Sequence, residues 1–232
     1  MTITSTTDLE TNARLLQAAG EVFAEHGFRR ATVREICSRA GANIAAVNYY
    51  FGDKARLYSQ VLRYGVGLAL QKYPPDMGLP ADRPATAQER LHAFVRALLF
   101  RLLDDGPYAW HGKLMLWEMI EPTAAGALDE LVGESIRPLY QRIEGIVTEL
   151  LGPAATPERV RMGIASTLGQ CIFYRSCRPM LARVQPGATN FDPARIEGLA
   201  DHVTRFTVAG LRAYVSGADQ VVSAGAKGAS PP

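Results

Sequence analysis

The chain has 232 residues, of which 47% are hydrophobic and 21% charged, and its formal net charge is +2. A chain of this kind buries a sizeable core and holds either one large domain or a small domain joined to a larger one. Its three cysteines include no CxxC pair, which argues against zinc and redox chemistry and favours a reducing cytoplasm. No apolar run reaches the roughly 18 residues of a membrane span, and the first residues lack a signal-peptide pattern. We therefore expect a cytoplasmic protein with no membrane partner.

The positive charge is concentrated in one part of the chain. Residues 26–66 contain seven Lys and Arg against two Asp and Glu, so this segment carries +5 while the remainder carries about −3. A local basic patch favours a polyanionic partner there. A solvated basic face is the commoner explanation for arginines taken singly, so charge alone leaves both alternatives open.

Four helices are predicted in the N-terminal part. Apolar residues recur at helical spacing over residues 8–26, and Gly27 supplies a stop. Thr32 is placed to cap a short helix that ends at Gly41, and Asn43 is placed to cap a third helix of about two turns. A fourth helix follows directly. A helix, a short helix, a tight turn and another short helix outline a helix-turn-helix.

The remainder of the chain is also predicted to be helical. A cluster of prolines and glycines between residues 73 and 86 predicts a loop and a domain boundary. Pro138 is expected to kink or divide the helix in which it lies. The predicted helices are residues 87–103, 108–119, 122–151, 157–177 and 193–216.

No strand alternation or internal repeat is present, so the predicted fold class is all-α. We expect a helix-turn-helix domain over residues 1–66 and a larger helical domain over residues 67–216. The Ala, Gly, Ser and Pro content of residues 217–232 predicts a disordered tail.

The predicted third helix has two different faces. At 100° per residue, Val47 and Phe51 share one edge and are expected to pack against the preceding helix. The outward face begins with the small Ala45 and ends with Asn48 and Tyr49. Small side chains let a helix approach a groove closely, and an Asn amide is able to make a two-pronged contact to adenine. This arrangement predicts a DNA recognition helix.

Neighbouring groups are suited to phosphate oxygens. The hydroxyls of Thr32, Tyr49 and Tyr50 and the ammonium of Lys54 are of the kind that contact the DNA backbone without reading sequence. The alternatives are that Thr32 and Asp53 act only as caps, that Tyr50 only fills the core, and that Asn48 is merely exposed to solvent.

The run AAGEVFAEHGFRRATVREICSRAGANIAAVNYYFGDKARLYSQVL, residues 18–62, resembles the DNA-binding domain of TetR-family transcriptional regulators. The shared elements are a Gly-Phe, a Thr at a helix start, an Ala-Gly turn, a Tyr-x-Phe ending and a Lys at the next helix start. The resemblance implies base contacts near Ile44, Ala45 and Asn48. It implies phosphate contacts near Thr32, Ala46, Tyr49, Tyr50 and Lys54. The predicted DNA-binding residues are Thr32, Asn43, Ile44, Ala45, Asn48, Tyr49, Tyr50 and Lys54.

Three positions depart from the family pattern. Tyr50 stands where the family usually has His, Asn48 where it often has Tyr, and Ala55 where Glu commonly follows the Lys. Ala46 lacks the hydroxyl that many members have, so it is left out of the predicted set. The operator sequence therefore cannot be carried over from relatives.

The C-terminal part resembles, more loosely, the CerR-like branch of that family through residues 110–138 and 169–175. Small-molecule sites are mostly apolar with a few placed polar groups. The residues predicted to line such a site are Phe94, Leu98, Trp110, Met115, Trp117 and Phe173, with His111, Glu118, Gln170 and Arg175 as polar anchors. The alternatives are that Trp117, Met115 and Phe173 belong to the core and that Glu118 and Arg175 pair with each other or with solvent.

The family resemblance also implies a homodimer formed by the last two long helices, residues 157–177 and 193–216. Their small and apolar residues suit close helix approach, although such helices are equally able to be buried within one subunit. A two-fold dimer predicts a palindromic operator in double-stranded DNA.

No enzyme motif is recognisable. The four histidines show no HExxH or other metal-ligand spacing, and GxSxG, P-loop and GxGxxG patterns are missing. We therefore expect no catalytic residues, no metal and no cofactor. The hypothesis is a repressor that releases DNA when a small molecule shifts its fourth helix. The alternative is a helical small-molecule-binding protein or a transcriptional activator.

Overall fold

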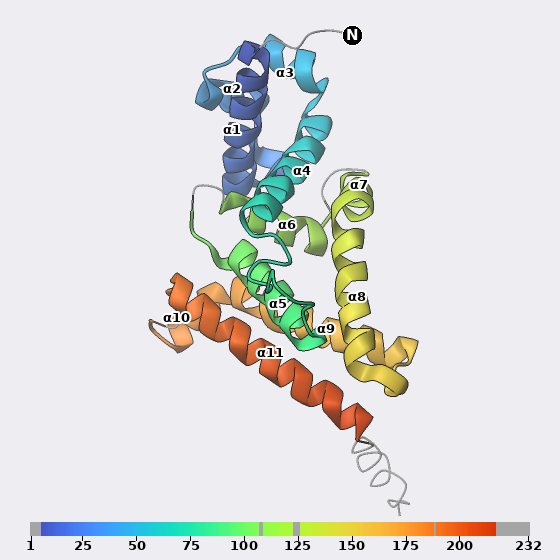
Figure 1. Ribbon diagram of the computed structural model, residues 1–232. Coiled ribbons are helices and arrows are strands. Elements are labelled where there is room, and N and C mark those ends of the chain that lie inside the picture. Colours follow the sequence, from blue (N-terminus) through green and yellow to red (C-terminus); the bar gives the residue numbers. More distant parts are fainter. Residues whose placement is uncertain (1–5, 107–108, 123–125, 188, 217–232) are drawn as a thin grey trace, which may run out of the picture. The chain divides into compact units, whose positions relative to one another are not determined.

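Figure 1 shows the computed structural model, which describes residues 6–106, 109–122, 126–187 and 189–216. The described residues contain helices and turns and no strand, which confirms the all-α prediction. The elements are α1 (Thr6–Arg30), α2 (Val33–Ala40), α3 (Ile44–Phe51), α4 (Lys54–Lys72), α5 (Ala87–Leu103), α6 (Trp110–Ile120), α7 (Ala127–Leu131), the π-helix η1 (Val132–Ile136), α8 (Arg137–Leu151), the 3-10 helix η2 (Gly152–Ala154), α9 (Pro157–Ser176), α10 (Arg178–Val184) and α11 (Pro193–Val215).

The chain forms two compact units. Unit 1 comprises Met1–Lys72 and Asp105–Pro138, and unit 2 comprises Tyr73–Asp104 and Leu139–Pro232. The segment from α6 to η1 thus packs with the four N-terminal helices, although it follows α5 in the chain. The functional division at residue 66 remains a prediction. The predicted tail at residues 217–232, and Tyr108 of the predicted 108–119 helix, lie outside the described residues.

Side-chain caps and one left-handed glycine set the path of the chain from α2 to α4. The Thr32 hydroxyl accepts a hydrogen bond from the Glu35 N–H at 3.2 Å, and the side-chain Oδ1 of Asn43 accepts one from the Ala45 N–H at 3.0 Å. Between them Gly41 has φ +60°, a conformation that favours glycine and turns the chain sharply. The predicted caps of α2 and α3 are confirmed.

α6 is anchored to unit 1 by a tryptophan that fits between two glycines. Trp110 is buried against Gly20 of α1 and Gly65 of α4. A Cβ atom at Gly20 would lie 2.6 Å from the indole, and one at Gly65 would lie 2.9 Å from it. The close approach of α6 to α1 and α4 therefore needs glycine at both positions.

Unit 2 is built on α5, α9 and α11, which pack against one another (Figure 1). Its core contains Phe94, Leu99, Ile164 and Leu211, all nearly or fully buried. The predicted 87–103, 157–177 and 193–216 helices are found with ends that agree within one residue. Each of these three helices is capped by a side chain at its N-terminus: Thr86, Thr156 and Asp192.

The predicted 122–151 helix is divided. α7 ends at Leu131, and a π-helical turn, Val132–Ile136, leads into α8. The Pro138 nitrogen has no hydrogen to donate to the preceding turn, so the irregular turn lies just before this proline. Residues 123–125 at the start of the predicted helix lie outside the described part.

Candidate nucleic-acid interface

α3 presents one exposed face. Asn43, Ala45 and Asn48 are exposed, Ile44 is 47% exposed, and Tyr49 is 76% exposed. A recognition helix needs its base-reading side chains free of the core, because base edges are reached only at the floor of a groove. The exposure of this face meets that requirement.

The opposite face of α3 is fixed to the protein. Val47 is fully buried and Phe51 is 3% exposed, and both belong to the same core cluster as Ile36 and Ala40 of α2. Two buried side chains on an eight-residue helix hold its orientation, since rotating α3 would expose both of them. The outward direction of Asn48 is therefore set by packing from behind.

The predicted phosphate-binding groups have different surroundings. Thr32 is exposed at the N-terminus of α2, whereas Tyr50 is half-buried and packs against the core. The Lys54 Nζ lies 4.8 Å from the centre of the Phe28 ring and 3.4 Å from the Arg29 carbonyl oxygen. Partial burial lowers the pKa of Lys54. Its ammonium is thus placed close to the chain just before α2.

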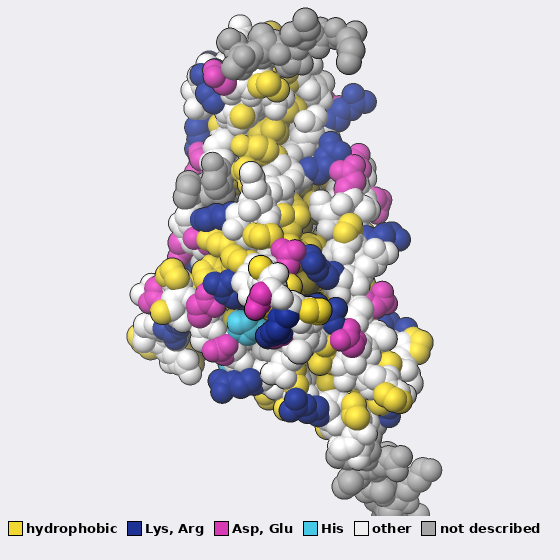
Figure 2. Space-filling model, viewed as in Figure 1, with side chains coloured by type: hydrophobic (Ala, Val, Ile, Leu, Met, Phe, Trp, Pro, Cys, Tyr) yellow, Lys and Arg dark blue, Asp and Glu magenta, His cyan; other side chains and the backbone are white. Residues whose placement is uncertain are grey.

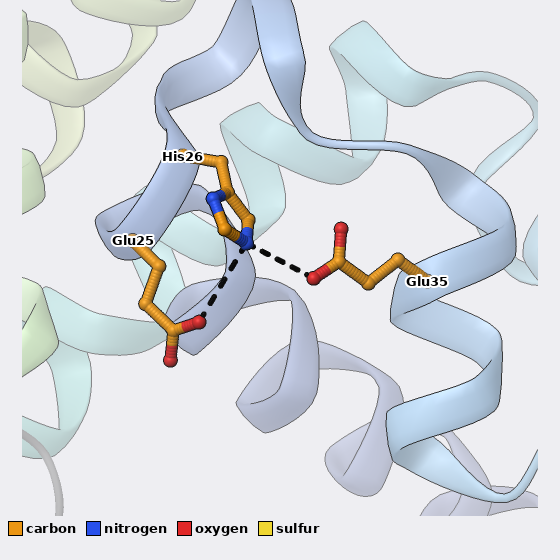
Figure 3. A group of neighbouring side chains, drawn as sticks. All are labelled: Glu25, His26 and Glu35. Carbon is orange, nitrogen blue, oxygen red and sulfur yellow. Dashed lines mark hydrogen bonds and ion pairs between the residues drawn. The ribbon is translucent and has the colours of Figure 1, made fainter.

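A charged network joins the end of α1 to α2 (Figure 3). The His26 Nε2 lies 3.0 Å from Glu35 Oε1 and 3.7 Å from Glu25 Oε2. The Arg39 guanidinium donates two hydrogen bonds to Glu25, at 2.8 and 2.9 Å, and these lower the pKa of the Glu25 carboxyl. The ligand atoms of Glu25, His26 and Glu35 are within 4.8 Å of one another. Arg39 already supplies a positive charge to these carboxylates, so the group holds the two helices together as an ion-pair network.

This network was not among the features predicted from the sequence. Glu35 and Arg39 are four residues apart on α2, which is a recognisable helical pair with a distance of 3.5 Å. His26 and Glu25 join the network only because Gly27, with φ +73° and ψ +165°, breaks the helical path of α1 and redirects the chain. The Glu35–Arg39 pair could have been predicted from the sequence. The contacts of Glu25 and His26 with α2 could not, because they depend on the fold.

The predicted ligand-binding residues are divided between the two units. Trp110, His111, Met115, Trp117 and Glu118 lie on α6 in unit 1. Within that unit, Trp110 fills the space between the two glycines, and the fully buried Glu118 accepts a hydrogen bond from the Tyr58 hydroxyl at 3.0 Å. These two side chains contribute to the packing of unit 1.

The other predicted ligand-binding residues are in unit 2. Phe94 is buried and Leu98 half-buried on α5, whereas Phe173 is 43% exposed on α9. The Gln170 side chain donates a hydrogen bond to the Ser166 carbonyl at 3.2 Å, and Arg175 is half-buried. Ligand binding by the residues of both units remains a prediction.

Unit 2 also contains an open cleft of about 620 Å³ between α5, α11 and the loop that precedes α5. Side chains of both charges gather over this part of the surface (Figure 2). His92 and Asp201 face each other there at 2.9 Å, and Glu89 is held by the Arg83 guanidinium. No predicted ligand-binding residue is among the described residues that line this cleft.

The comparisons with known proteins explain both parts of the chain. Residues 15–61 match the family described as "Bacterial regulatory proteins, tetR family". Residues 87–211, more than half of the chain, match "HTH-type transcriptional dual regulator CecR, C-terminal domain". The chain belongs to the TetR family. By that description, the branch that we named CerR-like from the sequence is CecR.

Curated relatives of this TetR-family chain are transcriptional regulators. It is 29% identical to the HTH-type transcriptional dual regulator CecR of Shigella flexneri, over 82% of this chain and 86% of the relative. It is 30% identical to the HTH-type transcriptional repressor Rv3405c of Mycobacterium tuberculosis, over 74% and 76% of the two chains. The relatives are therefore regulators and not enzymes.

The solved structure of another transcriptional regulator is similar over most of the chain. The transcriptional regulator FadR from Bacillus subtilis, in complex with stearoyl-CoA, has a TM-score of 0.62 at 20% identity, over 85% of this chain and 98% of FadR. At this identity the likeness concerns the fold. Among the described helices of the present chain, none is both long and apolar enough to cross a lipid bilayer.

Proposed function

We propose that this TetR-family regulator is a homodimeric repressor that binds a palindromic operator and releases it when a small molecule binds. The observation that carries the proposal is the face of α3, on which Asn48 and Tyr49 are exposed while Val47 and Phe51 are buried behind them. In this proposal Asn48 reads a base, and Thr32, Tyr49 and Lys54 position the module on phosphates.

Selection of DNA from a random pool by the purified protein tests the proposal first. Two copies of one half-site in inverted orientation are expected among the selected sequences. Enrichment of no sequence would refute specific recognition, and the protein would then be a ligand-binding protein without an operator. An enriched site that has no inverted copy would refute the palindrome.

Two substitutions then separate base reading from phosphate binding. Asn48→Ala is expected to weaken specific binding by about 1 to 3 kcal/mol and to relax the preference at one base pair. Lys54→Ala is expected to weaken binding to all sequences alike and to reduce the salt dependence. Gln71→Ala, at an exposed position on α4, serves as the control. It is expected to leave the DNA affinity and its salt dependence unchanged. Equal losses of Asn48→Ala on selected and random DNA would contradict its base-reading role.

The proposed dimer uses surfaces of α9 and α11 that the chain itself leaves uncovered. On α9 the exposed residues Met162, Ser166, Gly169 and Phe173 recur at helical spacing. Phe206 of α11 is 64% exposed, and exposed small residues follow it one turn later. α9 and α11 pack against each other, and large apolar side chains left exposed on neighbouring helices are typical of an interface.

Other small and apolar residues of these two helices are buried within the chain. Ile164, Val203, Val208 and Leu211 belong to the core of unit 2, and a Cβ atom at Gly163 would lie 2.9 Å from Leu211. The interface proposal therefore rests on the exposed stripes alone. Phe206→Glu is expected to yield monomers in light scattering and to abolish binding to a two-half-site operator. An unchanged dimer would contradict this assignment.

The proposed effector is a small molecule bound by the C-terminal part of the chain. FadR of Bacillus subtilis was solved with stearoyl-CoA, which makes acyl-CoA thioesters suitable first probes. A ligand releases DNA only to the extent that it prefers the DNA-incompetent form, and about 1.4 kcal/mol of preference changes DNA affinity tenfold. Adding stearoyl-CoA to the complex of the protein with the selected DNA tests this. If the DNA stays bound, the effector is a different molecule.

A further inference from the structure

Arg101 of α5 is a buried cation with almost no compensation. Its side chain is 7% exposed, and its Nη1 donates a hydrogen bond to the Tyr73 carbonyl oxygen at 2.6 Å. Its Nη2 is fully buried and has no hydrogen-bond partner. Among the described residues, no carboxylate forms an ion pair with this guanidinium. Desolvation lowers the pKa of Arg101 to about 10, so the side chain is still charged at neutral pH.

The other two arginines of α5 are paired. The Arg96 Nε donates to both oxygens of Glu197 at 2.7 and 2.8 Å, and Arg90 pairs with Glu149. Arg96 is more exposed than Arg101, with 25% of its side chain accessible. The most buried arginine of the helix is therefore the one without a carboxylate. Buried charges in proteins are paired, because the loss of hydration is otherwise uncompensated.

Arg101 continues a stripe of residues that were predicted to face a ligand. Phe94, Leu98 and Arg101 are spaced by four and three residues, so they lie on one side of α5. Phe94 is buried in the core of unit 2, and Leu98 packs against that core. An apolar stripe that ends in a buried guanidinium suits a molecule with an apolar body and one negatively charged group.

We propose that Arg101 binds the anionic group of the effector, and that the effector is an amphipathic acid whose apolar body packs along the half-buried Leu98. This inference rests on the proposed function, in which a small molecule binds the C-terminal part of the chain. A carboxylate and a phosphate share the chemistry that a guanidinium recognises. The anion would take the place of the Tyr73 carbonyl and would satisfy Nη2 as well.

The position of Tyr73 links this exchange to regulation. Tyr73 directly follows α4 in the chain, and its ring lies 5.1 Å from that of Phe100 on α5. Its carbonyl accepts the short hydrogen bond from Arg101. Replacing this carbonyl by a ligand anion would release a restraint on the residue after α4, the helix proposed to move when the effector binds.

Thermal unfolding of the full chain with matched probes tests the proposal. Octanoate and octanamide have the same apolar body and differ in charge, and inorganic phosphate carries the charge without the body. Octanoate is expected to raise the melting temperature of the wild type more than octanamide does. Arg101→Met should weaken octanoate binding about tenfold or more and remove the difference between the two probes.

Arg96→Met is the matched control, since it removes a paired arginine from the same helix. This variant is expected to have a lower melting temperature without ligand, because it leaves Glu197 unpaired. It should keep the preference for octanoate, because Arg101 is unchanged. Arg101→Met without ligand should melt at the same temperature as the wild type or higher, because it removes an uncompensated buried charge. Arg101→Lys keeps the charge and should retain part of the octanoate response, which guards against a variant that fails to fold.

Suppose that only phosphate raises the melting temperature and that Arg101→Met removes this shift. Arg101 would then still bind an anion, but the proposed ligand would be phosphate and not an amphipathic acid. Equal octanoate shifts in the wild type and Arg101→Met, or no shift with any of the anions, would overturn the proposal. DNA binding is measured separately on the selected operator, so a failure of the proposed regulator function is recognised independently of these shifts.

Discussion

The packing of Trp110 between Gly20 and Gly65 predicts opposite effects for two glycine substitutions on one helix. Gly65→Ala would place a Cβ atom 2.8 Å from the His111 Cβ and 2.9 Å from the indole of Trp110. Gly67, one half-turn further along α4, has no atom within 4 Å of the corresponding position. An alanine in a helix is favoured over glycine by about 1 kcal/mol, so Gly67→Ala is expected to stabilise the protein by roughly that amount.

At Gly20 and Gly65 the free-energy cost of overpacking exceeds the gain in helix propensity from alanine. Extra methyl groups in a tight core cost about 1 to 3 kcal/mol, which leaves Gly65→Ala destabilising by up to about 2 kcal/mol. Gly20→Ala should be at least as harmful, because three indole atoms lie within 2.7 Å of its Cβ position. Trp110→Ala is expected to cost about 3 to 5 kcal/mol through the cavity it leaves.

Urea unfolding followed by circular dichroism measures these free energies. A double-mutant cycle of Gly20→Ala with Trp110→Leu should show a coupling of about 0.5 to 3 kcal/mol, since the smaller side chain relieves the clash. Stabilisation of Gly65→Ala equal to that of Gly67→Ala would refute the reasoning, as would additive effects in the cycle.

Two further predictions concern a helix cap and a buried thiol. Asn43→Ala removes the acceptor for the Ala45 N–H and should lower the unfolding free energy by about 1 kcal/mol, measured as a shift of the urea midpoint; an unchanged midpoint would show that the cap is not needed. Burial raises the pKa of the Cys171 thiol to about 12 from a usual 9.0, so iodoacetamide at pH 8 should leave it unmodified until the protein is unfolded, as followed by mass spectrometry. Because the folded state retains the proton, the stability contributed by this burial is present below pH 9 and is lost as the pH rises towards 12. Labelling of native Cys171 at pH 8 would contradict both the protection of the thiol and this pH dependence.

Local sequence signals were sufficient for the helix-turn-helix. Thr32, Gly41 and Asn43 act within four residues of their own positions, and the burial of Val47 and Phe51 follows from helical spacing alone. The fold class depends on the same short-range rules. These features were predicted from the sequence because each depends on neighbours in the chain.

The position of α6 could not be predicted in this way. Trp110 and Glu118 are predicted to line a ligand pocket, because an apolar, aromatic helix with a few polar groups is typical of one. In the structure Trp110 contacts glycines 90 and 45 residues earlier in the chain, and Glu118 accepts its hydrogen bond from Tyr58. A buried aromatic in a core and one in a pocket have the same sequence signature, and only long-range packing distinguishes them.

Arg101 shows the opposite limit of sequence analysis. In the sequence it is one of several arginines on an amphipathic helix, where a long charged side chain normally reaches solvent. Its significance arises from the contrast between 7% exposure and a single neutral acceptor, which no pattern of residues reveals. A buried charge without a partner lowers the stability of the folded chain, and natural sequences retain such groups chiefly where they serve function. For this reason we place the effector's charge at Arg101 and not at the arginines that already hold carboxylates.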